Sequence, residues 1–251
     1  MRFFALLAFV AACAASPIAS EAALKPYVKP KSSDSRGPCP LLNTLANHGY
    51  LLVHTFSPHN GRNISVQDIG DAIFDATNWH TDFGILPATF AFQGLGLSSI
   101  KLSDLNNPKG GEHPASLTRK DASSGDSNTI DATRVAQLLA DSKTDYLTVE
   151  SLAKTRNRLD TTSSPLPTAR EISIGQGEGA LLMLLMRDTY VRSSNISTIR
   201  APKDRTKVWL LEERFPTAQG WQPAKETVQL SDTAPISTAI VDSQAVQRGT
   251  S

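Results

Sequence analysis

Residues 34–50 read DSRGPCPLLNTLANHGY, and this stretch carries the strongest local signal in the 251-residue chain. Pro40 suits the first position of a helix, because the N–H that proline lacks would be unpaired there. Gly49 is placed to end the same helix. One face of the expected helix carries apolar residues at helical spacing: Leu41, Leu42, Leu45 and Ala46. The stretch therefore predicts a helix that begins directly after Cys39.

Cys39 would lie at the positive end of this helix. There the helix dipole and the free N–H groups of Leu41 and Leu42 favour a thiolate, the form that acts as a nucleophile or a metal ligand. A small buried residue at a helix start is the alternative that the pattern alone leaves open. The chain has two cysteines, and the other, Cys13, falls in a segment that we expect to be removed. An unpaired thiol in an exported protein is unusual, which favours a chemical role for Cys39.

The N-terminus has the features of a secretory signal peptide. Arg2 precedes an apolar run over residues 3–15, and small residues follow that run. The run is shorter than the roughly 20 apolar residues of a transmembrane helix. We therefore expect residues 1–20 to be a signal peptide and the protein to be secreted, with no membrane attachment after cleavage. Sequons at Asn63 and Asn195 fit a glycoprotein.

Charge and periodicity together predict a single helical domain. The chain has 25 Lys and Arg against 24 Asp and Glu, so its electrostatics give no reason to expect a nucleic-acid partner. No alternating strand series and no internal repeat is visible. We expect an all-α domain over residues 24–228 and a poorly ordered polar tail over 229–251. Two further helices are expected to begin at N-caps, one at the Ser65–Asp68 capping box and one at Asp131. Three more are expected over 147–158, 178–186 and about 203–214. A polar connection is expected over 154–170.

The stretch around Cys39 closely resembles the proximal haem-ligand motif of the chloroperoxidases and unspecific peroxygenases, the fungal haem-thiolate peroxidases. In that family the cysteine between two prolines ligates the haem iron. The resemblance implies that Cys39 is the axial ligand of haem b, with four neighbours against the haem: Pro38, Pro40, Leu41 and Leu42. A thiolate ligand favours cleavage of the peroxide O–O bond.

Residues 112–121, EHPASLTRKD, resemble a second motif of the family. The resemblance implies that Glu112, His113 and Ser116 line a Mg²⁺ or Mn²⁺ site shared with a haem propionate, and such oxygen donors suit these cations. Pro114 stands where the family has an aspartate that orients the histidine, which predicts a weaker hold on His113. Gly111 and Leu181 stand where the family has bulkier or aromatic residues, which predicts a wider and less aromatic distal pocket.

Residues 176–183, QGEGALLM, resemble the distal segment of the family. The resemblance implies that Glu178 is the catalytic acid–base residue, with His113 beside it, and that Glu178 moves a proton between the two peroxide oxygens. We expect burial to raise the pKa of Glu178. Residues 207–221, KVWLLEERFPTAQGW, resemble the closing helix and Gly-Trp turn of the family, so the resemblance spans roughly residues 26–223.

The resemblance thus implies a secreted haem-thiolate peroxidase or peroxygenase that uses hydrogen peroxide to hydroxylate, epoxidise or halogenate small organic substrates. The alternative is a haem-binding family member with impaired or lost peroxide chemistry. Two departures from the family favour this alternative: Pro114 and the longer loop at 51–57. A secreted helical protein without a cofactor would require the Pro-Cys-Pro match to be accidental. The sequence decides neither the substrate, nor halogenation against oxygen transfer, nor Mg²⁺ against Mn²⁺, nor the oligomeric state.

Overall fold

The computed structural model describes residues 24–51, 59–124, 126–188 and 198–249. The expected signal peptide, Asn195 and all but the first residue of the 51–57 loop lie outside these ranges. The described residues form eight α-helices: α1 (Pro40–Asn47), α2 (Val66–Thr77), α3 (Asp82–Leu95), α4 (Ala132–Ala140), α5 (Val149–Thr162), α6 (Ala169–Met186), α7 (Lys203–Glu212) and α8 (Ala234–Arg248). Five 3₁₀ turns accompany them: Leu102–Asn106, Pro108–Gly110, Ala122–Ser124, Thr217–Gln219 and Leu230–Thr233.

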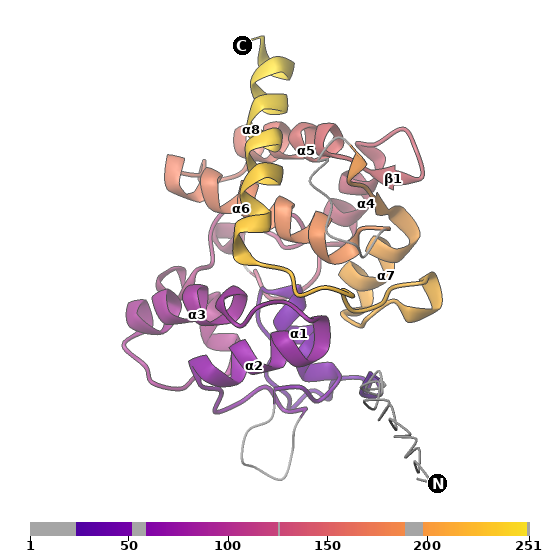
Figure 1. Cartoon of the computed structure of the whole chain (residues 1–251). Coiled ribbons are helices and arrows are strands. Elements are labelled where there is room, and N and C mark those ends of the chain that lie inside the picture. The colour runs from indigo at the N-terminus through magenta and orange to yellow at the C-terminus, as the bar shows by residue number, and fades with distance from the viewer. Residues whose placement is uncertain (1–23, 52–58, 125, 189–197, 250–251) are drawn as a thin grey trace, which may run out of the picture.

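The helices form two groups with α6 between them (Figure 1). Helices α2 and α3 pack on each other in the N-terminal half, next to α1. In the other half α8 lies across α5 and α6. Strands β1 (Tyr146–Leu147) and β2 (Ala201–Pro202) pair antiparallel, with Tyr146 opposite Pro202. This tiny sheet leaves the fold all-α, as predicted.

Side-chain caps set several helix starts. The Ser65 hydroxyl accepts the Asp68 N–H at 3.1 Å, and the Asp68 carboxylate accepts the Ser65 N–H at 2.8 Å, so the predicted capping box of α2 is confirmed. Asp131 likewise caps α4. A capping box of Thr168 with Glu171 starts α6 nine residues before Glu178. The predicted connection at 154–170 is therefore wrong at both ends, since α5 runs to Thr162 and α6 begins at Ala169, and the predicted helix start at 178 is wrong as well.

Two helices were not predicted at all. Helix α3 contains Pro87 and shows no single apolar face in its sequence. The expected disordered tail over 229–251 is wrong, because α8 occupies residues 234–248 and packs on α5 and α6. Its buried side chains recur one turn apart and number only three: Ile236, Ile240 and Gln244. These three buried residues form a narrow stripe, and one of them is an amide, so the sequence of α8 shows almost no hydrophobic periodicity.

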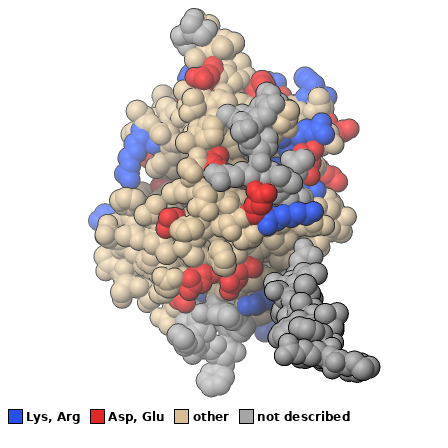
Figure 2. All heavy atoms as spheres, in the orientation of Figure 1, with Lys and Arg blue, Asp and Glu red and all other residues tan. Residues whose placement is uncertain are grey.

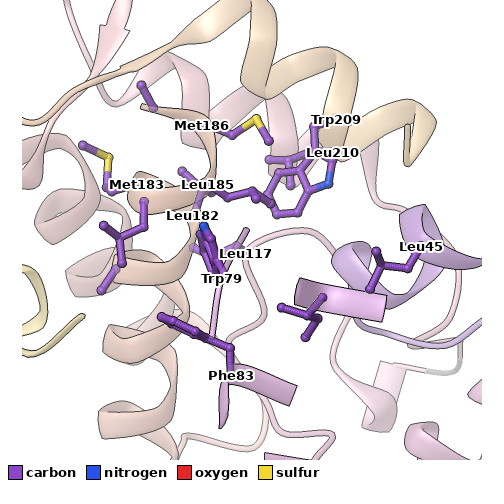
Figure 3. Close-up of a cluster of buried hydrophobic side chains, with 14 of the residues drawn as sticks. Leu45, Trp79, Phe83, Leu117, Leu182, Met183, Leu185, Met186, Trp209 and Leu210 are labelled. Carbon is purple, nitrogen blue, oxygen red and sulfur yellow. The ribbon is translucent and has the colours of Figure 1, made fainter. Parts of the chain in front are cut away.

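The core gathers around α6 (Figure 3). Leu182 lies near Trp79 and Phe83, which come from the α2–α3 region, and Leu185 points toward α7. Buried indole N–H groups are satisfied, since Trp209 donates to the Thr44 hydroxyl at 3.1 Å and Trp221 to the Leu185 carbonyl at 2.8 Å. The helix that carries Glu178 is therefore fixed by contacts with both halves of the domain.

The surface carries no extended patch of one charge on the face shown in Figure 2, where Lys and Arg are interspersed with Asp and Glu. This agrees with the balanced charge of the sequence. Among the described residues, no helix has the length and apolarity needed to cross a bilayer.

Candidate active site

Cys39 is the N-cap of α1, in extended conformation, and Pro40 is the first helical residue, as the sequence predicted. Burial raises the pKa of the Cys39 thiol, the N–H groups of Leu42 and Leu41 lower it, and the negative charges of Glu178 and Glu213 raise it further. The net pKa is above the ordinary value. The N–H groups at the helix start therefore act in the direction that the sequence predicted, but burial and the two carboxylates outweigh them. A bound iron ion would supply the missing positive charge.

A buried polar network holds the loop that carries Cys39. The Asn43 side chain accepts the Gly37 N–H at 2.9 Å and donates to the Gly37 carbonyl at 2.8 Å. Asn43 also donates to the Glu213 carboxylate at 2.8 Å, and Arg119 donates to the same carboxylate oxygen. Glu213 ends α7 in the left-handed region, with φ 49°. The cysteine loop is thus tied to Glu213, 170 residues after Asn43 in the sequence, and through Glu213 to Arg119.

Sequence reasoning did not single out Asn43, Arg119 or Glu213. All three lie inside the segments that carry the family resemblance, at 34–50, 112–121 and 207–221. Their position in those segments is the only signal in the sequence that could have indicated them. Their hydrogen bonds depend on the packing of α1 against α7.

His113 and Glu178 face each other, with His113 Nε2 3.4 Å from Glu178 Oε1. The other ring nitrogen, Nδ1, lies 2.8 Å from the Pro114 carbonyl oxygen. A backbone carbonyl therefore orients the ring in place of the absent aspartate side chain. The ring thus keeps a partner at Nδ1, whereas the weakened link from the cation site to the distal pocket that Pro114 predicts stays a prediction. His113 is buried, so its ring is fixed by packing as well as by these two contacts.

The pair is ionised at neutral pH. Burial lowers the pKa of His113, but the hydrogen bond and charge of Glu178 raise it to about 9. Burial raises the pKa of Glu178, but the hydrogen bond and charge of His113, together with the charge of Arg156, lower it below its ordinary value. The predicted rise in the pKa of Glu178 is therefore wrong, because the prediction considered burial without the imidazolium beside it.

The turn that carries His113 is fixed on both sides. Ala115 has φ 68°, a conformation that a non-glycine residue adopts only under constraint. Its N–H donates to the Asp121 carboxylate at 2.8 Å, and its carbonyl accepts from Arg156 Nη2 at 2.8 Å. Asp121 is held in turn by Arg134 at 3.1 Å.

Glu178 lies on a partly exposed face of α6. Its side chain is 45% accessible, and the protein atoms around the carboxylate nevertheless desolvate it. Ile174 and Leu181 lie one turn before and after it on the same face of α6 and are 38% and 37% exposed. The negative charge of Glu178 raises the pKa of Cys39, so carboxylate and thiol lie within electrostatic range of each other.

The chain leaves room beside this pair. A Cβ built on Gly177 or on Gly111 would meet no atom within 4 Å. The wider distal pocket that Gly111 and Leu181 predict stays a prediction. A separate surface hollow of about 730 Å³, next to Val149, Arg200 and Asp242, contains none of the predicted site residues.

The residues around Cys39 fit a haem. The five positions predicted to contact it, residues 38–42, are all half-buried, whereas residues 43–50 that follow are buried. An apolar group therefore has uncovered surface to contact at the start of α1. Cys39 would hold the metal of such a group as its one soft ligand.

The predicted cation site is not gathered in the same way. Both ring nitrogens of His113 are engaged, and the Ser116 hydroxyl accepts the N–H groups of Thr118 and Arg119 at 3.3 and 3.1 Å. Within the described ranges, no group of three or more His, Cys, Asp or Glu side chains is arranged to hold a metal ion. The His113 ring is not available as a ligand in this arrangement.

Comparison with known proteins agrees with the geometry. The profile of the family described as "Peroxidase, family 2" matches residues 25–226. Chloroperoxidase from Leptoxyphium fumago is 27% identical over 245 residues, which cover 86% of this chain and 62% of that protein. The dothistromin biosynthesis peroxidase dotB from Dothistroma septosporum is 38% identical over 91 residues, 34% of this chain and 20% of that protein. The chain thus spans less than two thirds of the length of either relative. It belongs to peroxidase family 2, the family of the chloroperoxidases.

Proposed function

We propose that the protein is a haem-thiolate peroxidase or peroxygenase that uses hydrogen peroxide to hydroxylate, epoxidise or halogenate small organic substrates. The observation that carries this proposal is the ionised His113–Glu178 pair, whose carboxylate lies within electrostatic range of the Cys39 thiol. A degraded family member remains the alternative. The oriented His113 ring speaks against it, because the pair survives the replacement of the family aspartate by Pro114.

Haem b held by Cys39 would supply an iron centre that binds peroxide and a thiolate that favours O–O cleavage. Glu178, kept ionised by His113, accepts a proton from the peroxide and returns it to the departing oxygen, which leaves as water. His113 holds the carboxylate in place through the contact at 3.4 Å. Ile174 and Leu181 present apolar surface beside the carboxylate, where an organic substrate can bind.

Three further features belong to this proposal. Oxygens of Glu112 and Ser116, with a haem carboxylate, would bind Mg²⁺ or Mn²⁺, and metal analysis of the purified protein tests this. The protein would be secreted and glycosylated, and Asn63 lies exposed as a glycan acceptor must. The dothistromin biosynthesis peroxidase among the relatives favours an organic metabolite as substrate.

The deciding experiment is the carbon monoxide spectrum of the reduced protein beside its Cys39→Ala variant. Thiolate ligation gives a strongly red-shifted Soret band, which the variant should lose because alanine offers the iron no ligand. A wild-type protein that folds and binds haem without this band would refute thiolate ligation. Peroxide-dependent oxidation of an organic substrate by the wild type then separates an active enzyme from a degraded one.

A further inference from the structure

A chain of buried polar side chains begins on the C-terminal helix α8. The amide of Gln244 is fully buried, and both its N–H groups and its oxygen make hydrogen bonds. Its nitrogen donates to Asp160 Oδ2 at 3.1 Å and to Asn157 Oδ1 at 3.2 Å, both on α5. Its oxygen accepts from Gln176 Nε2 on α6 at 2.8 Å. One side chain of α8 therefore fixes the polar groups of two neighbouring helices.

Asp160 connects Gln244 to Arg156. Its other carboxylate oxygen accepts from Arg156 Nη2 at 2.8 Å, and the same Arg156 group donates to the Ala115 carbonyl at 2.8 Å. Arg156 is fully buried, so Asp160 is the carboxylate that makes its charge tolerable at that depth. The guanidinium also packs against α6 at Gly175, where a Cβ would come within 2.7 Å of it.

Both members of the site pair lie at the end of this chain of contacts. Ala115 belongs to the turn that carries His113, and Gly175 and Gln176 lie within one turn of Glu178 on α6. We propose that α8 is part of the active-site scaffold and that Gln244 is a positioning residue for the His113–Glu178 pair. This inference rests on the proposed function, and α8 lies beyond residues 25–226 that match the family.

The chemistry of position 244 supports a positioning role over simple packing. The other buried residues of α8, Ile236 and Ile240, are apolar. Burying an amide costs free energy that only well-placed partners offset, whereas a leucine or methionine of similar volume would pack without that cost. A fully satisfied polar group instead fixes one arrangement of the helices that share it.

The test compares Gln244→Met with Ile236→Val in full-length protein. Methionine keeps the length of the side chain and removes every hydrogen bond of the amide, whereas valine loosens the packing of α8 without touching the polar chain. In haem-free protein, hydrogen exchange followed by mass spectrometry should speed up at residues 112–121 and 172–182 in Gln244→Met only. In haem-loaded protein, the second-order rate constant for reaction with hydrogen peroxide should fall about tenfold in Gln244→Met, with an unchanged carbon monoxide spectrum.

The outcomes separate the two proposals. The positioning role is overturned if hydrogen exchange at both segments is equal in the two variants. It is also overturned if exchange is faster in Gln244→Met but the variant reacts with peroxide as fast as the wild type. A loaded wild type that does not react with peroxide refutes the proposed function instead, and the exchange data still decide whether α8 holds the pair. Should Gln244→Met not fold, Gln244→Asn carries the same test, because it keeps an amide at position 244 but is one methylene too short to keep all three contacts.

Discussion

At the scale of single residues, Glu178 shows how a neighbour reverses the effect of burial. A carboxyl group enclosed by protein ordinarily has a raised pKa, and the sequence offered no reason to expect otherwise. The imidazolium of His113 lowers it again, so the group stands ready as a base, not as an acid. Chemistry at this position therefore begins with proton acceptance.

Replacing Glu178 by Gln should remove that step while the volume of the side chain is kept. An amide cannot accept the peroxide proton, so the rate constant for reaction with peroxide should fall by about 10² to 10⁴. Stopped-flow mixing of haem-loaded protein with hydrogen peroxide measures it. Glu226→Gln, at an exposed position, serves as the matched control and should react like the wild type. A Glu178→Gln variant of wild-type reactivity would remove Glu178 from the mechanism.

The ion pair also predicts how stability depends on pH. The pKa of His113 is about 9 in the folded protein against an ordinary value of 6.5. A raised folded pKa stabilises the fold fully below about pH 6.5, and the contribution disappears as the pH rises through about 9. The loss of unfolding free energy in His113→Gln should therefore be larger at pH 6.5 than at pH 10. Urea unfolding of haem-free protein at both values measures it, and an equal loss at both would contradict the ion pair.

At the scale of secondary-structure elements, the sequence predicted those helices whose N-cap residues directly precede an apolar periodic segment. The Ser65–Asp68 box and Asp131 lie just before apolar residues at helical spacing, so α2 and α4 were found. The equivalent box of Thr168 and Glu171 precedes a stretch with three glycines, whose low helix propensity hid the first half of α6. Propensity was overridden there by packing, since Gly175 makes room for Arg156.

Gly175 and Gly177, both in the turn of α6 before Glu178, should therefore respond oppositely to replacement by alanine. At Gly175 the new Cβ would lie 2.7 Å from a guanidinium held by Asp160, so Gly175→Ala should destabilise the fold by about 1–3 kcal/mol. At Gly177 the Cβ meets open space, so Gly177→Ala should stabilise it by up to about 1 kcal/mol through helix propensity. Urea unfolding of both haem-free variants compares them. A stabilising Gly175→Ala would mean that Arg156 is not held against α6.

At the scale of the whole molecule, the sequence indicated which residues carry the chemistry but not what holds them. Cys39, His113 and Glu178 were identified through short motifs that resemble a family. Arg156 and Gln244 lie outside those motifs, and their roles arise from hydrogen bonds between segments 41 and 84 residues apart. Contacts of that kind depend on how helices pack, and a single sequence does not encode packing in any local pattern.

The same reasoning predicts that the domain does not end where the family match ends. Removing residues 230–251 would uncover the faces of α5 and α6 on which α8 packs. Burial of Ile236 and Ile240 contributes about 1.5–3 kcal/mol each, and the total stability of a domain is about 5–15 kcal/mol. The truncated chain should therefore lose at least about 3 kcal/mol of unfolding free energy in urea. A truncated protein as stable as the full chain would show that the packing of α8 does not contribute to the stability of the domain. It would also show that Asp160 holds Arg156 without the hydrogen bond from Gln244.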